Sequence, residues 1–176
     1  YLGGLASKMT IQELNSLTIQ DAEAAFSKCC GARNWVRRMV NARPFVNLES
    51  LIAMANSVWE ACNIYDGAEA FMHHPQIGGT AELAKKFAST SEWASGEQAS
   101  VNQATTEVLQ ALADGNVAYK KKFGYIFIVC ATGKSAAEML DLLNERLPNT
   151  EEDEIRIAMA EQMKITIIRL EKLLTT

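Results

Sequence analysis

Apolar side chains recur every three to four residues along most of this chain, which is the spacing of amphipathic helices. Residues that commonly cap helix N-termini stand before several of these runs, as Thr18, Asn47 and Thr150 do. The helices predicted from the caps and the apolar positions cover residues 18–30, 34–43, 47–62, 80–88, 95–122, a stretch that opens at 135, and 150–174. The periodicity therefore predicts a protein built almost entirely from helices.

Two places depart from a simple helical pattern. Gly115 falls inside the predicted helix 95–122 and either interrupts it or is carried through it. Residues 125–131 (YIFIVCA) are rich in β-branched and aromatic side chains, which suit a buried strand. No second strand candidate exists to pair with them, so we predict an extended or irregular segment threaded through the core. The predicted fold class is all-α, a single compact multi-helix domain with one irregular apolar segment at about 125–131.

Size and charge narrow the class of protein. A chain of 176 residues with 48% hydrophobic content can form one well-packed domain, which we place at residues 9–176. Residues 1–8 are interpreted as an expression remnant or a disordered start, with the native start at Met9. The formal net charge of −4 argues against nucleic acid and against an anionic membrane as partners.

Targeting signals and cysteine usage indicate the compartment. The first nine residues are too short and too weakly apolar for a secretory signal, and the C-terminal residues do not form a peroxisomal tripeptide. No stretch reaches the roughly 18 apolar residues of a membrane span. The four cysteines show no C-x-x-C spacing and are interpreted as reduced thiols: Cys29, Cys30, Cys62 and Cys130. We expect a cytoplasmic protein without a membrane segment.

Two adjacent histidines, the only ones in the chain, lie in the segment FMHHPQIGG at residues 71–79. Imidazole is the side chain whose ordinary pKa lies nearest neutrality, so acid/base chemistry at pH 7 is most easily placed here. Pro75 fixes its own φ and restricts His74 to an extended conformation, which would hold the imidazole rigidly. The alternative is a solvated loop histidine without a chemical role.

Glu97 and Arg169 are two further charged residues in informative surroundings. Glu97 falls in the first turn of a predicted helix. Three roles are open for its carboxylate: it orients an imidazole, it binds a substrate N–H, or it only completes a capping box. Arg169 stands among the apolar residues of 167–173 and, if buried, needs an anion from a carboxylate or a ligand. Alternatively, it lies on the outer face of its helix and pairs with Glu171.

Templates of several other enzyme classes are missing from the sequence. There is no G-x-G-x-x-G and no Walker loop, which disfavours a nucleotide enzyme. His73 and His74 are adjacent, so they cannot share a helical face as zinc ligands at i and i+4 do. The cysteines lie in apolar runs typical of a core, although a Cys–His nucleophile pair stays open.

Four motifs occur in the order found in one known family. They are HPQIG at 74–78, SGEQA at 95–99, FGYIFIVCA at 123–131, and KI at 164–165 with RL at 169–170. With these motifs the chain resembles the 2-oxo-4-hydroxy-4-carboxy-5-ureidoimidazoline (OHCU) decarboxylases of urate degradation, from about Met9 to Leu174. Any one motif alone would be weak evidence, whereas the ordered set is specific.

The resemblance implies an all-α homodimeric enzyme that binds a small-molecule substrate and needs no metal or organic cofactor. Members of the family remove CO2 from OHCU to give (S)-allantoin, the last step of urate degradation, while the free substrate decays to racemic allantoin. Carried over residue by residue, His74 resembles the essential acid/base and Glu97 the carboxylate that orients it. Pro75 resembles the rigid support of that histidine in the substrate site.

Three more residues resemble substrate ligands of the family. Gln98, like Glu97, would bind ureido and ring groups, Val129 would offer backbone groups, and Arg169 would bind an anionic or carbonyl oxygen. The chain departs from the family pattern at Ala94, where members often have a serine. Ser91, Ser95 or a water molecule would then make that contact.

His73 is predicted to have no part in the site. Adjacent residues on an extended segment point to opposite sides, so only one of the two imidazoles can face a common pocket. We therefore expect the substitution His73→Ala to be mild.

Two rival readings stay open from the residues alone. One is a non-catalytic helical ligand-binding module in which the His-Pro loop and Arg169 form the binding site. The other is a metal-dependent hydrolase that uses His73, His74, Glu97 and a cysteine, and whose activity chelation would abolish. The sequence also leaves open whether the native protein is fused to a hydroxyisourate hydrolase domain.

Overall fold

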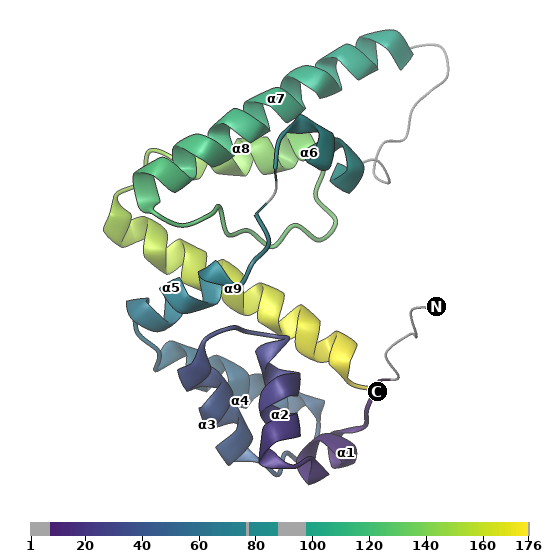
Figure 1. The fold of residues 1–176 in the computed structure, drawn as a ribbon, viewed down its shortest axis with the longest axis vertical. Helices are drawn as coiled ribbons and strands as arrows, with labels where there is room; N and C mark the ends of the chain where they lie inside the picture. The colour runs from purple at the N-terminus through teal and green to yellow at the C-terminus, as the bar shows by residue number, and fades with distance from the viewer. Residues whose placement is uncertain (1–7, 77, 88–97, 176) are drawn as a thin grey trace. The chain divides into compact units, whose positions relative to one another are not determined.

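The computed structural model describes residues 8–76, 78–87 and 98–175, with the backbone but not the side chains of 98–104. Within these ranges the chain forms helices and no named strand (Figure 1). The helices are α1 (Ile11–Ser16), α2 (Ile19–Ser27), α3 (Arg33–Ala42), α4 (Leu48–Glu60), α5 (Ile64–Met72), α6 (Thr80–Phe87), α7 (Gln98–Phe123), α8 (Ala136–Arg146) and α9 (Glu151–Leu173). The predicted all-α fold class is confirmed.

Two of these helices have no counterpart in the pattern of apolar residues. Helix α1 has six residues, too few to show a helical period. Helix α5 exposes Ile64, Tyr65 and Met72 by 53%, 79% and 79%, so its apolar residues do not form one buried stripe. The signal that does mark α5 is local: the Asn63 side chain accepts hydrogen bonds from the backbone N–H groups of the first turn.

Helix α7 passes through Gly115 without interruption, so of the two readings at this position the continuous one is right. A Cβ at Gly115 would overlap the side chain of Leu143 on α8. The absence of a side chain therefore lets α7 and α8 approach closely, and Figure 1 shows the two helices running alongside each other.

The chain divides into two compact units, each with an apolar core of its own. Among the described residues, unit 1 comprises 8–73 and 159–175, and thus α1 to α5 with the later part of α9. Unit 2 comprises residues from 74 to 158, and thus α6, α7, α8 and the beginning of α9. The domain limits of 9–176 stay a prediction.

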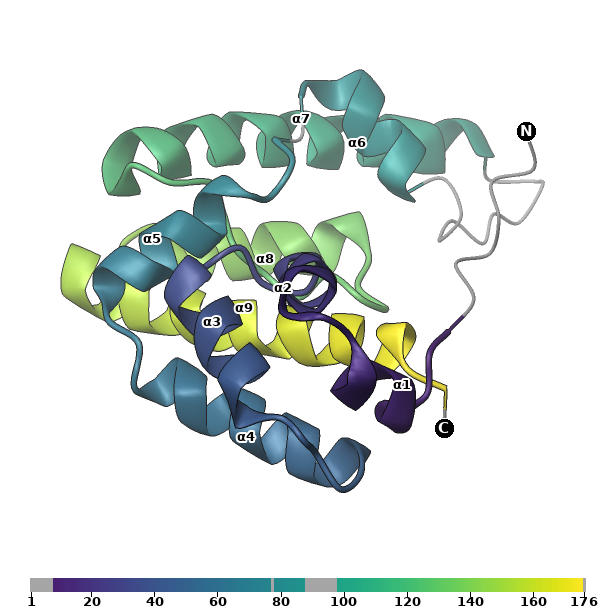
Figure 2. The ribbon, with the colours of Figure 1, turned by 60° about the horizontal axis from the view of Figure 1, so that its bottom comes forward.

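The core of unit 1 is centred on aromatic side chains. Helix α3 packs between α2 and α4 (Figure 2). Phe26 meets Trp35 and Phe45 edge to face, with ring centroids 5.9 and 6.4 Å apart. The indole Nε1 of Trp35 donates to the Ala55 carbonyl at 3.2 Å, so this fully buried ring leaves no N–H unpaired.

Helix α9 also positions α4 and α5 within unit 1. The Nε1 of Trp59 on α4 donates to the Met159 carbonyl at 2.9 Å. A Cβ on the buried Gly67 of α5 would lie 3.0 Å from Met159 Cγ, which is tighter than ordinary contact. Glycine at this position therefore lets α5, which leads to the histidine pair, lie close to α9.

Unit 2 contains a buried ion pair between Arg146 and Glu154, whose exposed fractions are 6% and 0%. Arg146 Nε donates to Glu154 Oε1 at 2.7 Å, and the Tyr119 hydroxyl donates to the same oxygen at 2.6 Å. Asn149 Nδ2 donates to Oε2 at 3.0 Å. These hydrogen bonds offset the cost of taking the carboxylate out of water. Burial, together with the bond to Glu154, raises the pKa of Tyr119.

Candidate active site

The histidine pair begins where α5 ends. His73 is the C-cap residue of α5, with φ −83° and ψ −4°, which is helical backbone. The prediction that His73 lies on an extended segment is therefore wrong, because α5 continues to Met72 and its last turn includes the next residue. The imidazole of His73 packs against Gly31, where an added Cβ would overlap the ring. His73 is otherwise exposed, so the contact with Gly31 indicates a limited packing role in unit 1.

His74 is the first residue of unit 2 and is half-buried, whereas Pro75 after it is exposed. The loop that follows is attached to α6, since the N–H of Gly78 donates to Glu82 Oε2 at 2.6 Å. A Cβ on Gly78 would lie 2.7 Å from the Glu82 carboxylate, so a larger residue here would displace the end of that side chain. A half-buried imidazole can be reached by a ligand and still be oriented by the protein.

Several predicted site features lie outside the described residues. Glu97 is one of them, and with it the predicted capping box and the alanine at position 94. Gln98 is the first residue of α7, but its side chain is also outside the described part. The roles of Glu97 and Gln98 stay predictions.

The segment 125–131 connects α7 to α8 without regular secondary structure, as predicted. Its alternate side chains, which pack against the core of unit 2, are Tyr125, Phe127, Val129 and Ala131. This alternation is that of an extended chain. The backbone N–H and C=O of Val129 make no hydrogen bond to any residue that the structure describes. Val129 therefore has the unpaired backbone groups that its predicted role requires.

Two cations that bind this segment have no role in the prediction from sequence. Arg146 Nη1 donates to the Ile128 carbonyl at 2.7 Å, and Lys134 Nζ donates to the Cys130 carbonyl at 2.7 Å. The sequence does carry a signal for Arg146. It follows Met139 by seven residues on α8, and Met139 is a core residue, so the arginine falls on the buried stripe of the helix.

Arg169 lies in the later part of α9 and is half-buried. Its Nη1 donates to the Cys29 carbonyl at 3.4 Å. None of the salt bridges found among the described residues includes Arg169, so the weighed pairing with Glu171 is not formed there. A half-buried guanidinium without a carboxylate partner is suited to bind an anionic ligand.

None of the four cysteines is joined in a disulfide; Cys29, Cys30 and Cys130 are buried and Cys62 is half-buried. Three of them have strongly shifted pKa values. Burial raises the pKa of Cys29 to about 12, of Cys30 to about 11 and of Cys62 to about 12. These three thiols stay protonated at neutral pH, and a protonated thiol is a poor nucleophile. A Cys–His nucleophile built on any of them is therefore disfavoured.

Metal sites and membrane spans were sought in the described ranges. No group of three or more His, Cys, Asp or Glu side chains there is arranged to hold a metal ion. None of the helices described is both long and apolar enough to cross a membrane.

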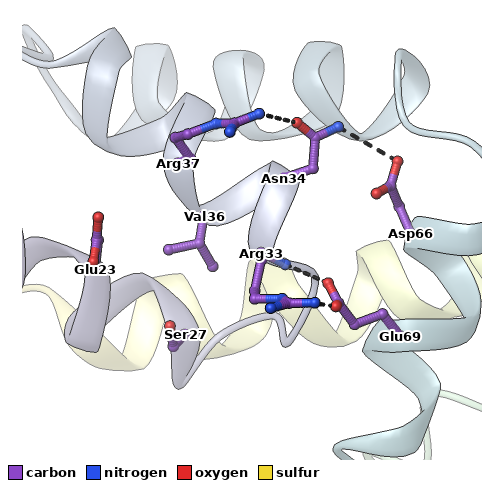
Figure 3. A pocket seen from close by; sticks show the side chains of 8 residues that line it. All are labelled: Glu23, Ser27, Arg33, Asn34, Val36, Arg37, Asp66 and Glu69. Atoms are coloured by element: carbon purple, nitrogen blue, oxygen red, sulfur yellow. Dashed lines mark hydrogen bonds and ion pairs between the residues drawn. The ribbon is translucent and has the colours of Figure 1, made fainter.

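A cavity of about 500 Å³ on unit 1 contains none of the predicted site residues (Figure 3). It is lined by Glu23, Ser27, Arg33, Asn34, Val36, Arg37, Asp66 and Glu69. Arg33 Nε lies 3.0 Å from Glu69 Oε2, and Arg37 donates to the Asn34 side chain at 3.2 Å. Because its cations already have acceptors and Arg33 is 91% exposed, this cavity is a solvated surface groove.

Comparison with known proteins links these features to urate degradation. A sequence model described as OHCU decarboxylase matches residues 15–171. The uric acid degradation bifunctional protein of Arabidopsis thaliana is 38% identical over 159 residues, which is 89% of this chain and 48% of that protein. The 2-oxo-4-hydroxy-4-carboxy-5-ureidoimidazoline decarboxylase of Haloferax volcanii is 26% identical over 164 residues, 93% of this chain and 95% of that protein. This chain thus spans about half the length of the Arabidopsis relative, and 32% of a bifunctional relative from Bacillus sp..

Two solved structures resemble the fold. The crystal structure of an OHCU decarboxylase in the presence of (S)-allantoin shares 39% sequence identity at a TM-score of 0.67, covering 84% of this chain and 95% of that chain. The crystal structure of an (S)-allantoin synthase has a TM-score of 0.70 and covers 96% of this chain and 55% of that chain. Its sequence identity is 16%, so this second likeness shows the fold alone.

Proposed function

This chain belongs to the OHCU decarboxylase family, and we propose that it catalyses the decarboxylation of OHCU to (S)-allantoin and CO2, the last step of urate degradation. The observation that carries the proposal is the match of the family's sequence model to residues 15–171. A structure 39% identical to this chain, determined in the presence of (S)-allantoin, supports the same reaction. The enzyme is then a carboxy-lyase.

The chemistry of the substrate explains why few catalytic groups are needed. The carboxylate of OHCU is attached to a ring carbon that carries a hydroxyl and adjoins a C=N group. When the C–C bond breaks and CO2 leaves, the electron pair passes into this conjugated group, so no organic electron sink is required. The nitrogen of the C=N group takes up a proton as it receives the electron pair. The hydroxyl proton then leaves as the ring carbonyl forms, and the carbon bearing the ureido group takes up a second proton on one face. One proton thus replaces CO2 overall.

The protein has to orient the breaking bond and to move these protons. His74 is the proposed acid/base, because an imidazole can both accept and donate a proton near pH 7. Its half-buried position supports this role. Glu97 is proposed to hold the ring by a hydrogen bond, and Pro75 to keep the backbone of His74 rigid. Delivery of the last proton to one face makes the product the (S) enantiomer.

Arg169, Val129 and Gln98 are the proposed substrate ligands. Arg169 would bind the carboxylate or a carbonyl oxygen, and the lack of a carboxylate partner among the described residues supports this assignment. Val129 would pair its free backbone groups with the ring or ureido group. Gln98 would bind the ureido or ring atoms from the start of α7.

Three further properties belong to the proposal: the resemblance implies the first two, and the cysteine usage of the sequence favours the third. The enzyme acts without a metal or organic cofactor, assembles as a homodimer and works in the cytoplasm. Light scattering of the purified protein tests the dimer. Addition of a chelator to the activity assay tests the metal, since the rival reading as a metal-dependent hydrolase requires a loss of activity.

The decisive experiment is an assay of stereospecific product formation. OHCU is generated freshly from urate with the upstream enzymes, the protein is added, and optical activity is followed with time. We expect (S)-allantoin to form faster than the racemic background, with and without chelator. Racemic product at the rate of a protein-free control would contradict the proposed function, and ligand binding without CO2 release would favour the non-catalytic binding module.

A further inference from the structure

We propose that Lys134 and Arg146 are positioning residues that hold the segment 125–131 so that Val129 presents its backbone groups to the substrate. This inference rests on the proposed function, because Val129 is a substrate contact only if the chain acts on OHCU. It concerns two residues that none of the four family motifs contains.

The geometry of the two contacts carries the inference. Arg146 and Lys134 bind the carbonyls of Ile128 and Cys130, each at 2.7 Å, and these residues flank Val129. In an extended chain the C=O and N–H groups of successive residues point to opposite edges, so those of residues two apart share an edge. Both cations therefore hold the same edge, and the N–H and C=O of Val129 point to the other one.

The anchor at Arg146 is rigid. Its guanidinium is paired with the fully buried Glu154 and lies over the Phe127 ring, 4.6 Å from the ring centroid. Tyr119 and Asn149 in turn fix the carboxylate of Glu154. A side chain held from three sides cannot follow a shift of the Ile128 carbonyl, so the carbonyl has to stay in place.

The anchor at Lys134 comes from the start of α8. The backbone N–H of Lys134 donates to the Ala131 carbonyl at 3.0 Å, which closes a turn. The next residue, Ser135, caps α8 through a capping box. The ammonium group thus extends from a fixed backbone to the Cys130 carbonyl. A charged donor on a main-chain carbonyl makes a stronger hydrogen bond than water or a neutral group does.

Such anchoring serves recognition as well as folding. Ile128 and Cys130 are buried, so their carbonyls need partners within the protein, and the two cations supply them on either side of Val129, whose backbone groups have none among the described residues. A displacement of about 1 Å at a group that positions the substrate can cost roughly 100-fold in rate. The two anchors are therefore expected to act on substrate affinity and turnover through Val129.

The test compares Lys134→Met with the matched control Lys122→Met. Lys122 also binds main-chain carbonyls in unit 2, those of Leu147 and Asn149 at 2.7 and 2.8 Å. Among the described residues it forms no hydrogen bond or ring contact with the segment 125–131. We expect Lys134→Met to raise KM for OHCU, and the Kd for added (S)-allantoin, about tenfold. Lys134→Arg should restore most of both losses, and Lys122→Met should leave both near the wild-type values.

Amide hydrogen exchange of residues 125–131 gives a readout that does not depend on activity. We expect about tenfold faster exchange in Lys134→Met and wild-type exchange in Lys122→Met. Unchanged KM and exchange in Lys134→Met, or equal kinetic losses in both variants, would overturn the proposal. If the wild type forms no (S)-allantoin, the proposed function and the substrate role of Val129 both fail, while the exchange data still decide whether the two cations hold the segment.

Discussion

Arg146 in unit 2 and Arg169 in unit 1 are both withdrawn from solvent, but their surroundings differ. Arg146 is 6% exposed and meets the Glu154 carboxylate and the Ile128 carbonyl. Arg169 is half-buried, and its hydrogen bond to the described part of the chain is a 3.4 Å contact with the Cys29 carbonyl. One guanidinium is matched by a protein anion, and the other is not.

This difference indicates two roles for arginine in this protein, one structural and one in ligand binding. A buried cation whose charge is neutralised within the protein connects elements of the fold, here α8 with the start of α9 and the segment before α8. A half-buried cation without a carboxylate partner keeps its capacity to bind an anion. We therefore propose that Arg146 holds the structure of unit 2, including the segment 125–131, and that Arg169 binds the substrate.

The largest effect is expected at His74. As with the two arginines, we expect one of the two neighbouring histidines, His74, to act on the substrate and the other, His73, to be structural. His74→Asn should lower kcat roughly 10²–10⁴-fold, because the variant loses general acid/base catalysis. The measurement is the rate of (S)-allantoin formation from fresh OHCU. Near-wild-type turnover would show that the proposed role of His74 is wrong.

His73→Ala is the matched control for that variant. The ring of His73 packs against Gly31, and its backbone ends α5, so a structural role in unit 1 accounts for it. We expect kcat within about threefold of the wild type and a small loss of stability. Equal losses of activity in the two variants would contradict the separation of the histidines into one structural and one chemical residue.

The next effect concerns stability and is expected at Arg146. Arg146→Met leaves the fully buried Glu154 without its cation, which should cost about 3–5 kcal/mol in the free energy of unfolding. Urea unfolding measures this cost. The double variant Arg146→Met/Glu154→Met should be more stable than the single one, because no charge is then left unpaired. A double variant as unstable as the sum of both single losses would mean that packing, not charge, holds this part of unit 2.

A smaller effect on binding is expected at Arg169. Arg169→Met should weaken substrate binding or turnover about 10- to 100-fold, the usual worth of a charged hydrogen bond. Its free energy of unfolding should change by less than about 1 kcal/mol, since no described carboxylate loses a partner. Lys172→Met removes an exposed cation from the same helix and is the control, for which we expect wild-type kinetics. If Arg169→Met lost stability but kept wild-type kinetics, Arg169 would have a structural role, as Arg146 has.

The helices could be predicted from sequence where a local cap and an apolar stripe agree. Asn47 and Ser135 form the predicted caps, each accepting a hydrogen bond from the backbone two or three residues into its helix. Helix α5 could not be found in this way, because apolar residues such as Tyr65 and Met72 face solvent. Its close contact with α9 through Gly67 depends on residues far away in the sequence.

The family could be predicted from four short motifs, and the comparisons confirm it. The environment of each site residue is a different matter. The position of Arg146 on the buried stripe of α8 is visible in the sequence, but its pairing with Glu154 and the packing of Tyr119 from α7 are not. Conversely, whether Arg169 pairs with a carboxylate depends on packing, so the sequence left open a pair with Glu171 and an anion from elsewhere. Among the described residues it forms no salt bridge.

The smallest effect is expected from two thiols beside Arg169, those of Cys29 and Cys30, each 1% exposed. Burial raises their pKa values from 9.0 to about 12 and about 11. The thiol pKa values in the folded state lie above those in the unfolded chain. The free energy of unfolding is therefore highest below pH 9 and falls as the pH rises from 9 toward 11–12. Each thiol should contribute a slope of about 1.4 kcal/mol per pH unit within that window.

Urea unfolding between pH 7 and 10 measures this slope before Tyr119, whose ordinary pKa is 10.0, begins to contribute. Cys29→Ala/Cys30→Ala should reduce the slope above pH 9 to the contribution of Cys62, whose pKa burial raises likewise, and leave the curve unchanged below pH 9. The Arg169 charge lowers both thiol pKa values, against the effect of burial. Loss of this charge in Arg169→Met moves the end of the window to still higher pH, so the curve between pH 7 and 10 should keep the slope of the wild type. A changed slope in that range would contradict the assignment of the slope to thiols that stay protonated in the folded state.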